Sequence, residues 1–497
     1  MRSRRIAIVG AGIGGLAAAI DLARTGERVT VFERARGPGG KIRQAALDSV
    51  TIDAGPTVVT MKWVFEELFS DAGRSFAESV TTHALDILAR HAFDGGSRLD
   101  LFADHARSAA AIGEFAGSKE ARGFLDFTKR AHETYRTLEN SFIRSDQPSP
   151  VSLAMGAGLK GLGDLWRISP FSTLWNALGD HFNDMRLRQL FARYATYCGS
   201  SPFDCPATLM LVADVERQGV WIVDGGMQRL AAACHELAVA CGVEFRFETE
   251  VTRIEIEMGR AAGITLQSWE KIAVDGVIVN ADPAAVSSGL FGRDVAPAVT
   301  AIAPSSRSLS AITFAGEMPA EGFPLSHHNV FFGRDYHQEF DDIFRFARVP
   351  SDPTVYVCAQ DRGPGRSHES SKRERLFLLV NAPAIGDTHR FTSEEVNQCR
   401  KSILSRLNRC GLTIEGLDQA TVTTPADFNR LFPATGGALY GQATHGWTAS
   451  FTRPSARTRC PGLYLAGGAV HPGPGVPMAA LSGRIAARSV VADLISR

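Results

Sequence analysis

The chain has 497 residues, which at roughly 150 residues per domain is enough for about three domains. Its 53 Lys and Arg residues balance 53 Asp and Glu residues, and a net charge of zero argues against nucleic acid as a partner. Hydrophobic residues make up 44% of the chain and charged residues 21%, which excludes extended disorder for most of it. The eight cysteines include no Cys-x-x-Cys pair, so we expect neither a disulfide scaffold nor a zinc cluster, and a reducing cytoplasm fits.

The apolar patterns predict alternating strands and helices at the start of the chain. A strand is expected at 5–9, a helix with apolar residues recurring from 16 to 23, and a second strand at 29–32. A Gly-rich turn joins the first strand to the helix. This order is typical of a doubly wound parallel sheet.

Later segments predict an inserted region and then a return to the first sheet. The composition from 62 to 218 favours helices, and strand patterning returns at 242–256 and 274–279. Further strands, expected to form a separate sheet, are predicted at 308–314, 330–332, 354–358 and 376–380. The remaining predictions are a helix at 394–407, a strand at 461–466 and a helix at 479–495.

The predicted fold class is therefore α/β, with a discontinuous Rossmann-like domain, an inserted α+β substrate domain and a helical part. We expect the discontinuous domain to comprise residues 1–61, 219–290 and 455–497. The helical region is expected at 62–218 and the substrate domain, with a mixed sheet, at 291–454.

The turn after the first strand carries a dinucleotide-binding pattern. Gly10, Gly12 and Gly15 form Gly-x-Gly-x-x-Gly, and Glu33 closes the second strand. The glycines permit a tight turn, close approach to a pyrophosphate and close packing of helix on strand, and the helix N-terminus favours an anion. Glu33 is positioned to accept hydrogen bonds from ribose hydroxyls.

Several further motifs resemble the flavin amine oxidase and phytoene desaturase superfamily over the whole chain. They are a Gly-Gly-Lys turn at 39–41, Asp-Ala-Gly-Pro at 53–56, Asp-Gly-Gly-Met at 224–227, Glu-Val at 250–251 and Asn-Ala-Asp-Pro at 280–283. The resemblance implies FAD as the cofactor. The residues that it adds to the expected FAD site are Ile13, Gly14, Arg34, Gly40, Lys41, Gly55, Pro56 and Val251.

The C-terminal segment resembles the ending of bacterial carotenoid desaturases. Gly468 stands where many amine oxidases carry an acid, which speaks against amine oxidation. A helix beginning near Val476 would point its positive end at the flavin. Because Pro477 has no N–H, the expected contacts are the amides of Val476 and Met478, together with Gly467 and Gly468.

Within that group the motifs at 39–43 and 475–484 look most like the 1-hydroxycarotenoid 3,4-desaturases of purple photosynthetic bacteria. The resemblance implies an enzyme that desaturates an acyclic 1-hydroxycarotenoid at C3–C4, by hydride transfer to flavin N5 and proton loss. Phytoene desaturation, amine oxidation and a non-enzymatic prenyl-binding escort role remain the alternatives.

His471, in the turn beside the expected flavin, is the candidate general base. The other histidines, including His327 and His328, show no ligand spacing, so no metal site is expected.

The predicted substrate, a long apolar carotenoid, dissolves in lipid rather than water. Neither of the long uncharged stretches, 431–452 and 460–483, is apolar enough to span a bilayer. The segment 151–182, rich in Leu, Trp and Phe, is instead interpreted as a surface patch that rests on the membrane, with internal helix packing as the alternative. We therefore expect a cytoplasmic protein, peripherally bound to the inner, photosynthetic membrane. The sequence leaves the oligomeric state open.

Overall fold

The computed structural model describes residues 3–47, 50–146, 172–364 and 373–495. Its first sheet has five parallel strands in the order β21-β13-β1-β2-β9. These strands are β1 (Arg5–Val9), β2 (Arg28–Phe32), β9 (Glu244–Arg246), β13 (Gly276–Val279) and β21 (Leu463–Leu465). The sheet confirms the α/β class, and it is assembled from stretches of chain that lie far apart in the sequence.

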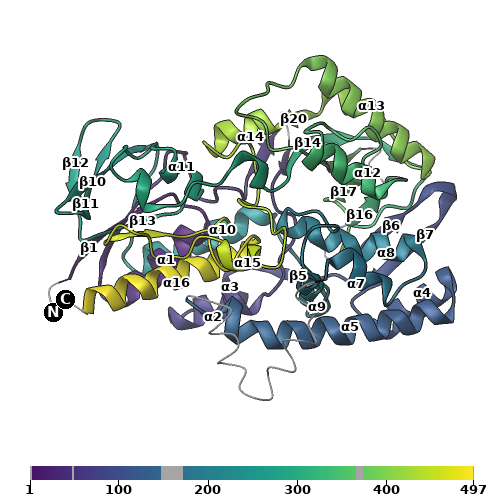
Figure 1. Ribbon diagram of the computed structural model, residues 1–497, viewed down its shortest axis with the longest axis horizontal. Helices are drawn as coiled ribbons and strands as arrows, with labels where there is room; N and C mark the ends of the chain where they lie inside the picture. The colour runs from purple at the N-terminus through teal and green to yellow at the C-terminus, as the bar shows by residue number, and fades with distance from the viewer. Residues whose placement is uncertain (1–2, 48–49, 147–171, 365–372, 496–497) are drawn as a thin grey trace.

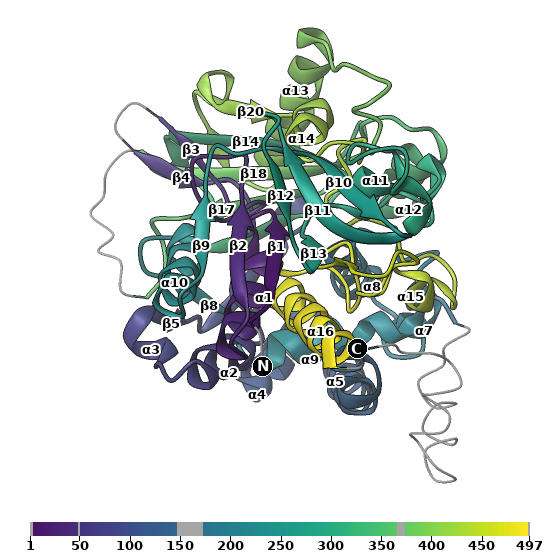
Figure 2. The ribbon, with the colours of Figure 1, turned by 90° about the vertical axis from the view of Figure 1, so that its left-hand side faces the viewer.

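Side chains of β1 alternate between two cores, one on each face of this sheet. Ile6 and Ile8 pack against the helices α1 (Ile13–Arg24), α10 (Met227–Ala240) and α16 (Val476–Ile495). Ala7 and Val9 pack against a three-stranded antiparallel sheet, which lies in front of the parallel strands in Figure 2. Its strands are β10 (Val251–Glu257), β11 (Arg260–Leu266) and β12 (Lys271–Ala273), and α11 (Pro283–Ser287) joins the same core. Burial on both faces explains why β1 is a continuous apolar run.

The second large sheet has seven strands in the order β20-β14-β18-β17-β16-β6-β7. They are β6 (Ile87–Ala92), β7 (Arg98–Phe102), β14 (Ser310–Met318), β16 (His328–Phe331), β17 (Val355–Ala359), β18 (Glu374–Ala382) and β20 (Thr421–Thr423). All neighbours are antiparallel except β6 and β16. Helix α13 (Ser393–Arg409) covers one face of this sheet (Figure 1), and the opposite face lines the cavity described below.

Two strands of this sheet, β6 and β7, lie inside the segment expected to be helical. Arg90 and His91 interrupt the apolar alternation of β6, which hid the strand in the sequence. In the structure Arg90 forms an ion pair with Asp100 on β7 at 2.7 Å, and His91 is buried. Pairing across the hairpin therefore compensates for the polar residues that break the pattern.

The rest of the segment is mainly helical. Its helices are α2 (Trp63–Asp71), α3 (Phe76–Ser79), α4 (His105–Ala116), α5 (Ser118–Leu138), α7 (Leu174–Gly179), α8 (Met185–Ala192) and α9 (Leu211–Arg217). Other short strands and α-helices among the described residues are β3 (Gln44–Ala46), β4 (Thr51–Asp53), β5 (Thr82–Ala84), β8 (Trp221–Val223), β15 (Ala320–Glu321), β19 (Thr413–Ile414), α12 (Tyr336–Phe340), α14 (Pro425–Leu431) and α15 (Ala449–Thr452).

The segment interpreted as a membrane patch is only partly described. Residues 151–171 lie outside the described residues. Leu174 and Leu178 are buried in a core shared with α8, and Trp175 packs at a tilt against Phe203 with 4.8 Å between ring centroids. This end of the segment is therefore helix packing rather than exposed surface. Among the helices that the structure describes, none is both long and apolar enough to cross a membrane.

Candidate flavin site and substrate cavity

The Gly-rich turn places the N-terminus of α1 at the edge of a large cavity. Gly10 has a φ of 103°, which favours glycine, and its N–H donates to the Phe32 carbonyl at 2.8 Å. A Cβ atom at Gly15 would lie 2.2 Å from the Gly10 carbonyl oxygen, so only glycine fits there. Gly12 caps the helix without a side-chain hydrogen bond, and Gly12 and Gly14 line the cavity. The first N–H groups of the helix are therefore available to an anion.

Glu33, at the end of the neighbouring strand β2, also lines this cavity. Its two carboxylate oxygens accept hydrogen bonds from the backbone N–H groups of Ala11 and Ala35, each at 2.8 Å. A carboxylate can accept about four hydrogen bonds. The two backbone donors therefore fix its position and leave acceptor capacity for ribose hydroxyls.

The Gly-Gly-Lys turn and the Asp-Ala-Gly-Pro segment pack against each other beside α1. The Gly39 N–H donates to the Ala11 carbonyl at 2.9 Å, and a Cβ atom at Gly55 would lie 2.1 Å from the Lys41 carbonyl oxygen. The Lys41 ammonium donates to the Leu439 carbonyl, and burial lowers the pKa of Lys41 below its ordinary value. These segments form a second wall of the cavity.

The C-terminal turn closes the site from the other side. The Gly467 N–H donates to the Ser482 hydroxyl of α16 at 3.2 Å. Helix α16 begins at Val476, as the C-terminal motif indicated, and not at 479, where the apolar pattern placed its start. Fifteen of the sixteen residues expected to bind the cofactor line one cavity of about 760 Å³; they are Gly10, Gly12, Ile13, Gly14, Glu33, Arg34, Gly40, Lys41, Gly55, Pro56, Val251, Gly467, Gly468, Val476 and Met478. Gly15 does not line the cavity. It lies behind it, where α1 packs closely against the end of β1.

The lining of the cavity also includes polar groups that the sequence motifs did not indicate. Arg193 donates to the Tyr197 hydroxyl at 3.1 Å, and that hydroxyl donates to Glu216 at 2.7 Å. Although burial opposes its charge, Tyr197 and Glu216 raise the pKa of Arg193. Tyr356 lies between the Thr57 hydroxyl and His328 Nδ1, at 2.7 Å from each. All of these residues line the cavity, which is otherwise largely apolar.

Comparison with known families accounts for a dinucleotide-binding edge that opens into a largely apolar cavity. A model of the family described as flavin containing amine oxidoreductase matches residues 13–491. The chain belongs to this family.

Its relatives include three hydroxyneurosporene desaturases. It is 52% identical to hydroxyneurosporene desaturase of Rubrivivax gelatinosus, over 100% of this chain and 95% of the relative. It is 41% identical to hydroxyneurosporene desaturase of Cereibacter sphaeroides, over 99% and 98%. These relatives confirm the resemblance to 1-hydroxycarotenoid desaturases, and the family confirms a flavin cofactor.

Two solved structures share the fold of this chain at low identity. Putrescine oxidase bound to putrescine matches with a TM-score of 0.61 at 14% identity, over 100% of both chains. A fatty acid isomerase from P. acnes matches with a TM-score of 0.58 at 14% identity, over 98% of both chains.

The structure corrects the prediction for His471, because this residue does not line the flavin cavity. Its Nε2 lies 2.9 Å from the Ser145 carbonyl oxygen, and its ring packs edge-on against Phe142 at 5.0 Å between centroids. Burial lowers its pKa to about 4. His471 is thus a buried, neutral side chain that ties the C-terminal turn to the segment around Ser145. Its position in the sequence next to the flavin turn did not indicate that the side chain points the other way.

Proposed function

We propose that this chain is an FAD-dependent desaturase that acts at C3–C4 of an acyclic 1-hydroxycarotenoid of the hydroxyneurosporene type. The observation that carries the proposal is the single cavity, in which a dinucleotide-binding edge is continuous with an apolar space bounded by a small polar cluster. The identity of 41–52% to hydroxyneurosporene desaturases over nearly the full length supports the same substrate class.

The residues at the dinucleotide edge fit FAD. The uncapped N-terminus of α1, at Gly12 to Gly14, would hold the pyrophosphate, and Glu33 the adenosine ribose. The amides at the start of α16, at Val476 and Met478, would contact the ring system. When bound, FAD supplies the acceptor for the two electrons that desaturation removes.

The apolar part of the cavity would align the polyene and keep water away from the reacting bond. Phe377 and Leu379 of β18, with Phe428 and Phe432, are among its walls. A cavity without water would favour hydride transfer from the aligned polyene to the flavin over side reactions with solvent. The protein therefore contributes mainly orientation and exclusion of water.

The polar cluster is our candidate for recognition of the hydroxyl end of the substrate. The hydroxyl on C1 is joined to C3 through one further carbon, so its oxygen lies within roughly 4 Å of C3. The groups that bind it must therefore lie inside the cavity, close to the reacting bond. Arg193 can donate to the hydroxyl oxygen, and Tyr197, whose own hydroxyl is held by Glu216, fixes the guanidinium.

We further propose that residues 1–61, 219–290 and 455–497 form the discontinuous flavin domain, that the helical segment 62–218 lends β6 and β7 to the sheet of the substrate domain, and that the protein binds the membrane surface peripherally. The insolubility of a carotenoid in water supports membrane delivery, because the substrate must enter the cavity from lipid. Flotation of the purified protein with liposomes would test this directly. Recovery of the protein entirely in the lipid-free fraction would contradict it.

The function is tested with purified, FAD-loaded protein and three substrates. Hydroxyneurosporene and phytoene are supplied in phosphatidylcholine liposomes, and putrescine in buffer. We expect a red-shifted product spectrum from hydroxyneurosporene, little change with phytoene and no oxidation of putrescine. New conjugation from phytoene alone would favour phytoene desaturation, amine turnover would favour an amine oxidase, and absence of FAD binding would exclude all three.

A further inference from the structure

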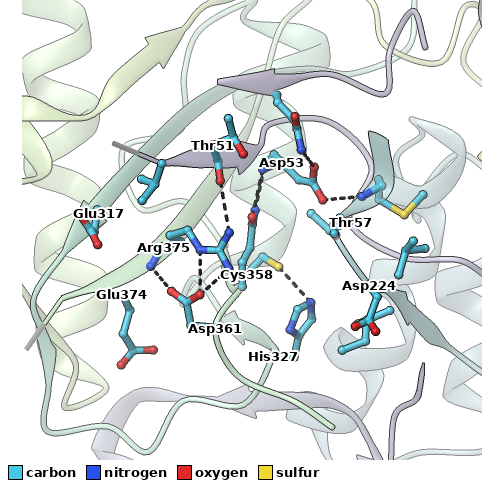
Figure 3. Close-up of a pocket in the computed structure, with 18 of the residues that line it drawn as sticks. Thr51, Asp53, Thr57, Asp224, Glu317, His327, Cys358, Asp361, Glu374 and Arg375 are labelled. Carbon is cyan, nitrogen blue, oxygen red and sulfur yellow. Dashed lines mark hydrogen bonds and ion pairs between the residues drawn. The ribbon is translucent and has the colours of Figure 1, made fainter. Parts of the chain in front are cut away.

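Three side chains with metal-binding atoms converge between β16 and β17. One ring nitrogen each of His327 and His328 and the Cys358 sulfur lie within 4.8 Å of one another. His328 is paired directly with Cys358 across the antiparallel strands, which places their side chains on the same face. All three residues are buried, and Figure 3 shows His327 and Cys358 pointing toward each other.

The hydrogen bonds of His327 orient its ring for metal binding. Its Nδ1 lies 2.6 Å from the Arg362 carbonyl oxygen. A carbonyl can only accept, so Nδ1 carries the hydrogen and Nε2 carries a lone pair. That Nε2 lies 3.5 Å from the Cys358 sulfur. A backbone carbonyl on the outer nitrogen is the usual arrangement for a histidine that binds a metal through the other one.

His328 also has a hydrogen-bond partner on its outer nitrogen, here a hydroxyl that can donate or accept. Its Nδ1 lies 2.7 Å from the Tyr356 hydroxyl, which is itself 2.7 Å from the Thr57 hydroxyl. Its Nε2 is buried and has no hydrogen-bond partner among the described residues. Buried polar atoms without a partner are rare and need an explanation. A thiol–imidazole hydrogen bond between Cys358 and His327 would leave this nitrogen unexplained.

We propose that His327 Nε2, His328 Nε2 and Cys358 Sγ bind a transition-metal ion of the zinc class. Two imidazoles and one thiolate form a three-ligand set that leaves the fourth tetrahedral position open. Binding releases the Cys358 thiol proton to solvent, and both histidines bind as neutral imidazoles.

A polar pocket next to the cluster provides the entry path. His327 and Cys358 line this pocket of about 700 Å³, together with the carboxylates of Asp53, Asp361 and Glu374. It is distinct from the flavin cavity, although Thr57 lines both. Asp361 and Glu374 form ion pairs with Arg375 and Arg362, so the pocket gives the cluster a polar rather than a strongly anionic surrounding.

The ion would connect β16 and β17 in the wall of the substrate cavity. His328 and Tyr356 line that cavity, so metal binding at Nε2 of His328 would fix the chain of hydrogen bonds through Tyr356 to Thr57. The proposed ion would thus hold the cavity wall while keeping its fourth position open, and the site does not depend on which substrate the protein desaturates.

The test measures metal content and a spectrum rather than activity. Untagged, FAD-loaded protein is exchanged with Zn²⁺, dialysed and analysed for bound metal. We expect about one zinc ion per chain, a loss of at least about tenfold in Cys358→Ser and in His327→Gln, and no loss in Cys399→Ser. Cys399 is the matched control because it is equally buried, in α13 behind the same sheet. Cobalt-loaded wild type should show thiolate-to-cobalt charge-transfer absorption, which Cys358→Ser lacks.

Retention of FAD by each variant checks that it is folded. If Cys358→Ser does not fold, the metal content and cobalt spectrum of the wild type and of His327→Gln still decide the question. Wild-type protein that retains FAD but neither zinc nor a cobalt–thiolate band would overturn the proposal. Equal zinc content in wild type and Cys358→Ser would overturn it as well.

Discussion

Gly14 and Gly483 lie in direct contact where the first and last helices cross. A Cβ atom at residue 483 would lie 2.0 Å from the Gly14 carbonyl oxygen. This contact joins α1 to α16 directly behind the turn that faces the flavin cavity (Figure 1). Two segments more than 450 residues apart thus form one binding edge.

We expect Gly483→Ala to destabilise the protein and to weaken FAD binding together. The added methyl group must push α16 away from Gly14, and overpacking of this kind costs about 1–3 kcal/mol. Thermal unfolding and FAD titration measure the two effects. Gly37→Ala is the control, because a Cβ atom there would have no neighbour within 4 Å. Unchanged FAD affinity in Gly483→Ala would contradict the role of this crossing.

Glu33→Gln should weaken FAD binding without unfolding the protein. The amide preserves the size of the side chain but replaces one acceptor oxygen with a donor. The loss of a hydrogen bond to a charged group, about 1.5–3 kcal/mol, predicts a Kd for FAD at least tenfold higher, measured by fluorescence titration. Glu27→Gln is a suitable control, since Glu27 also accepts from a backbone N–H, that of Arg4 at 2.8 Å, outside the cavity. Equal Kd values for FAD in Glu33→Gln and Glu27→Gln would exclude Glu33 from the ribose site.

His471 should affect stability in acid rather than desaturation. Burial holds its folded pKa at about 4, below the ordinary value of about 6.5, so the unfolded chain binds the proton more readily. The free energy of unfolding is then independent of His471 above pH 6.5. It falls as the pH drops toward 4, by about 3 kcal/mol in total. His471→Gln should flatten this part of the stability profile measured by denaturant unfolding. Its pH–rate profile should match the wild type, and loss of a base limb there would restore His471 as the general base.

The sequence predicted those parts of the site that depend on local geometry. The turn from Gly10 to Gly15 and the start of α16 at Val476 require particular residue types at fixed spacing, so their patterns can be read directly. The cluster of His328 and Cys358 could not be predicted, because it depends on the register of β16 with β17. Arg193 was missed for a related reason: it enters the cavity from a short helical turn without a motif.

Arg193→Gln should reduce the preference for a hydroxylated substrate. The variant loses the charged donor that we place at the substrate hydroxyl, and loss of such a bond costs about 1.5–3 kcal/mol. The ratio of kcat/KM for hydroxyneurosporene to that for neurosporene, which lacks the hydroxyl, should therefore fall by at least about tenfold. Arg188→Gln is the matched control, because Arg188 lies in α8 and donates to the Trp175 carbonyl at 2.7 Å rather than facing the cavity. If Arg193→Gln lowers both rates equally, the residue supports the cavity wall and the hydroxyl is recognised elsewhere. A selective loss with hydroxyneurosporene would instead assign the polar cluster to substrate recognition, because a purely structural defect should lower the rate with both polyenes.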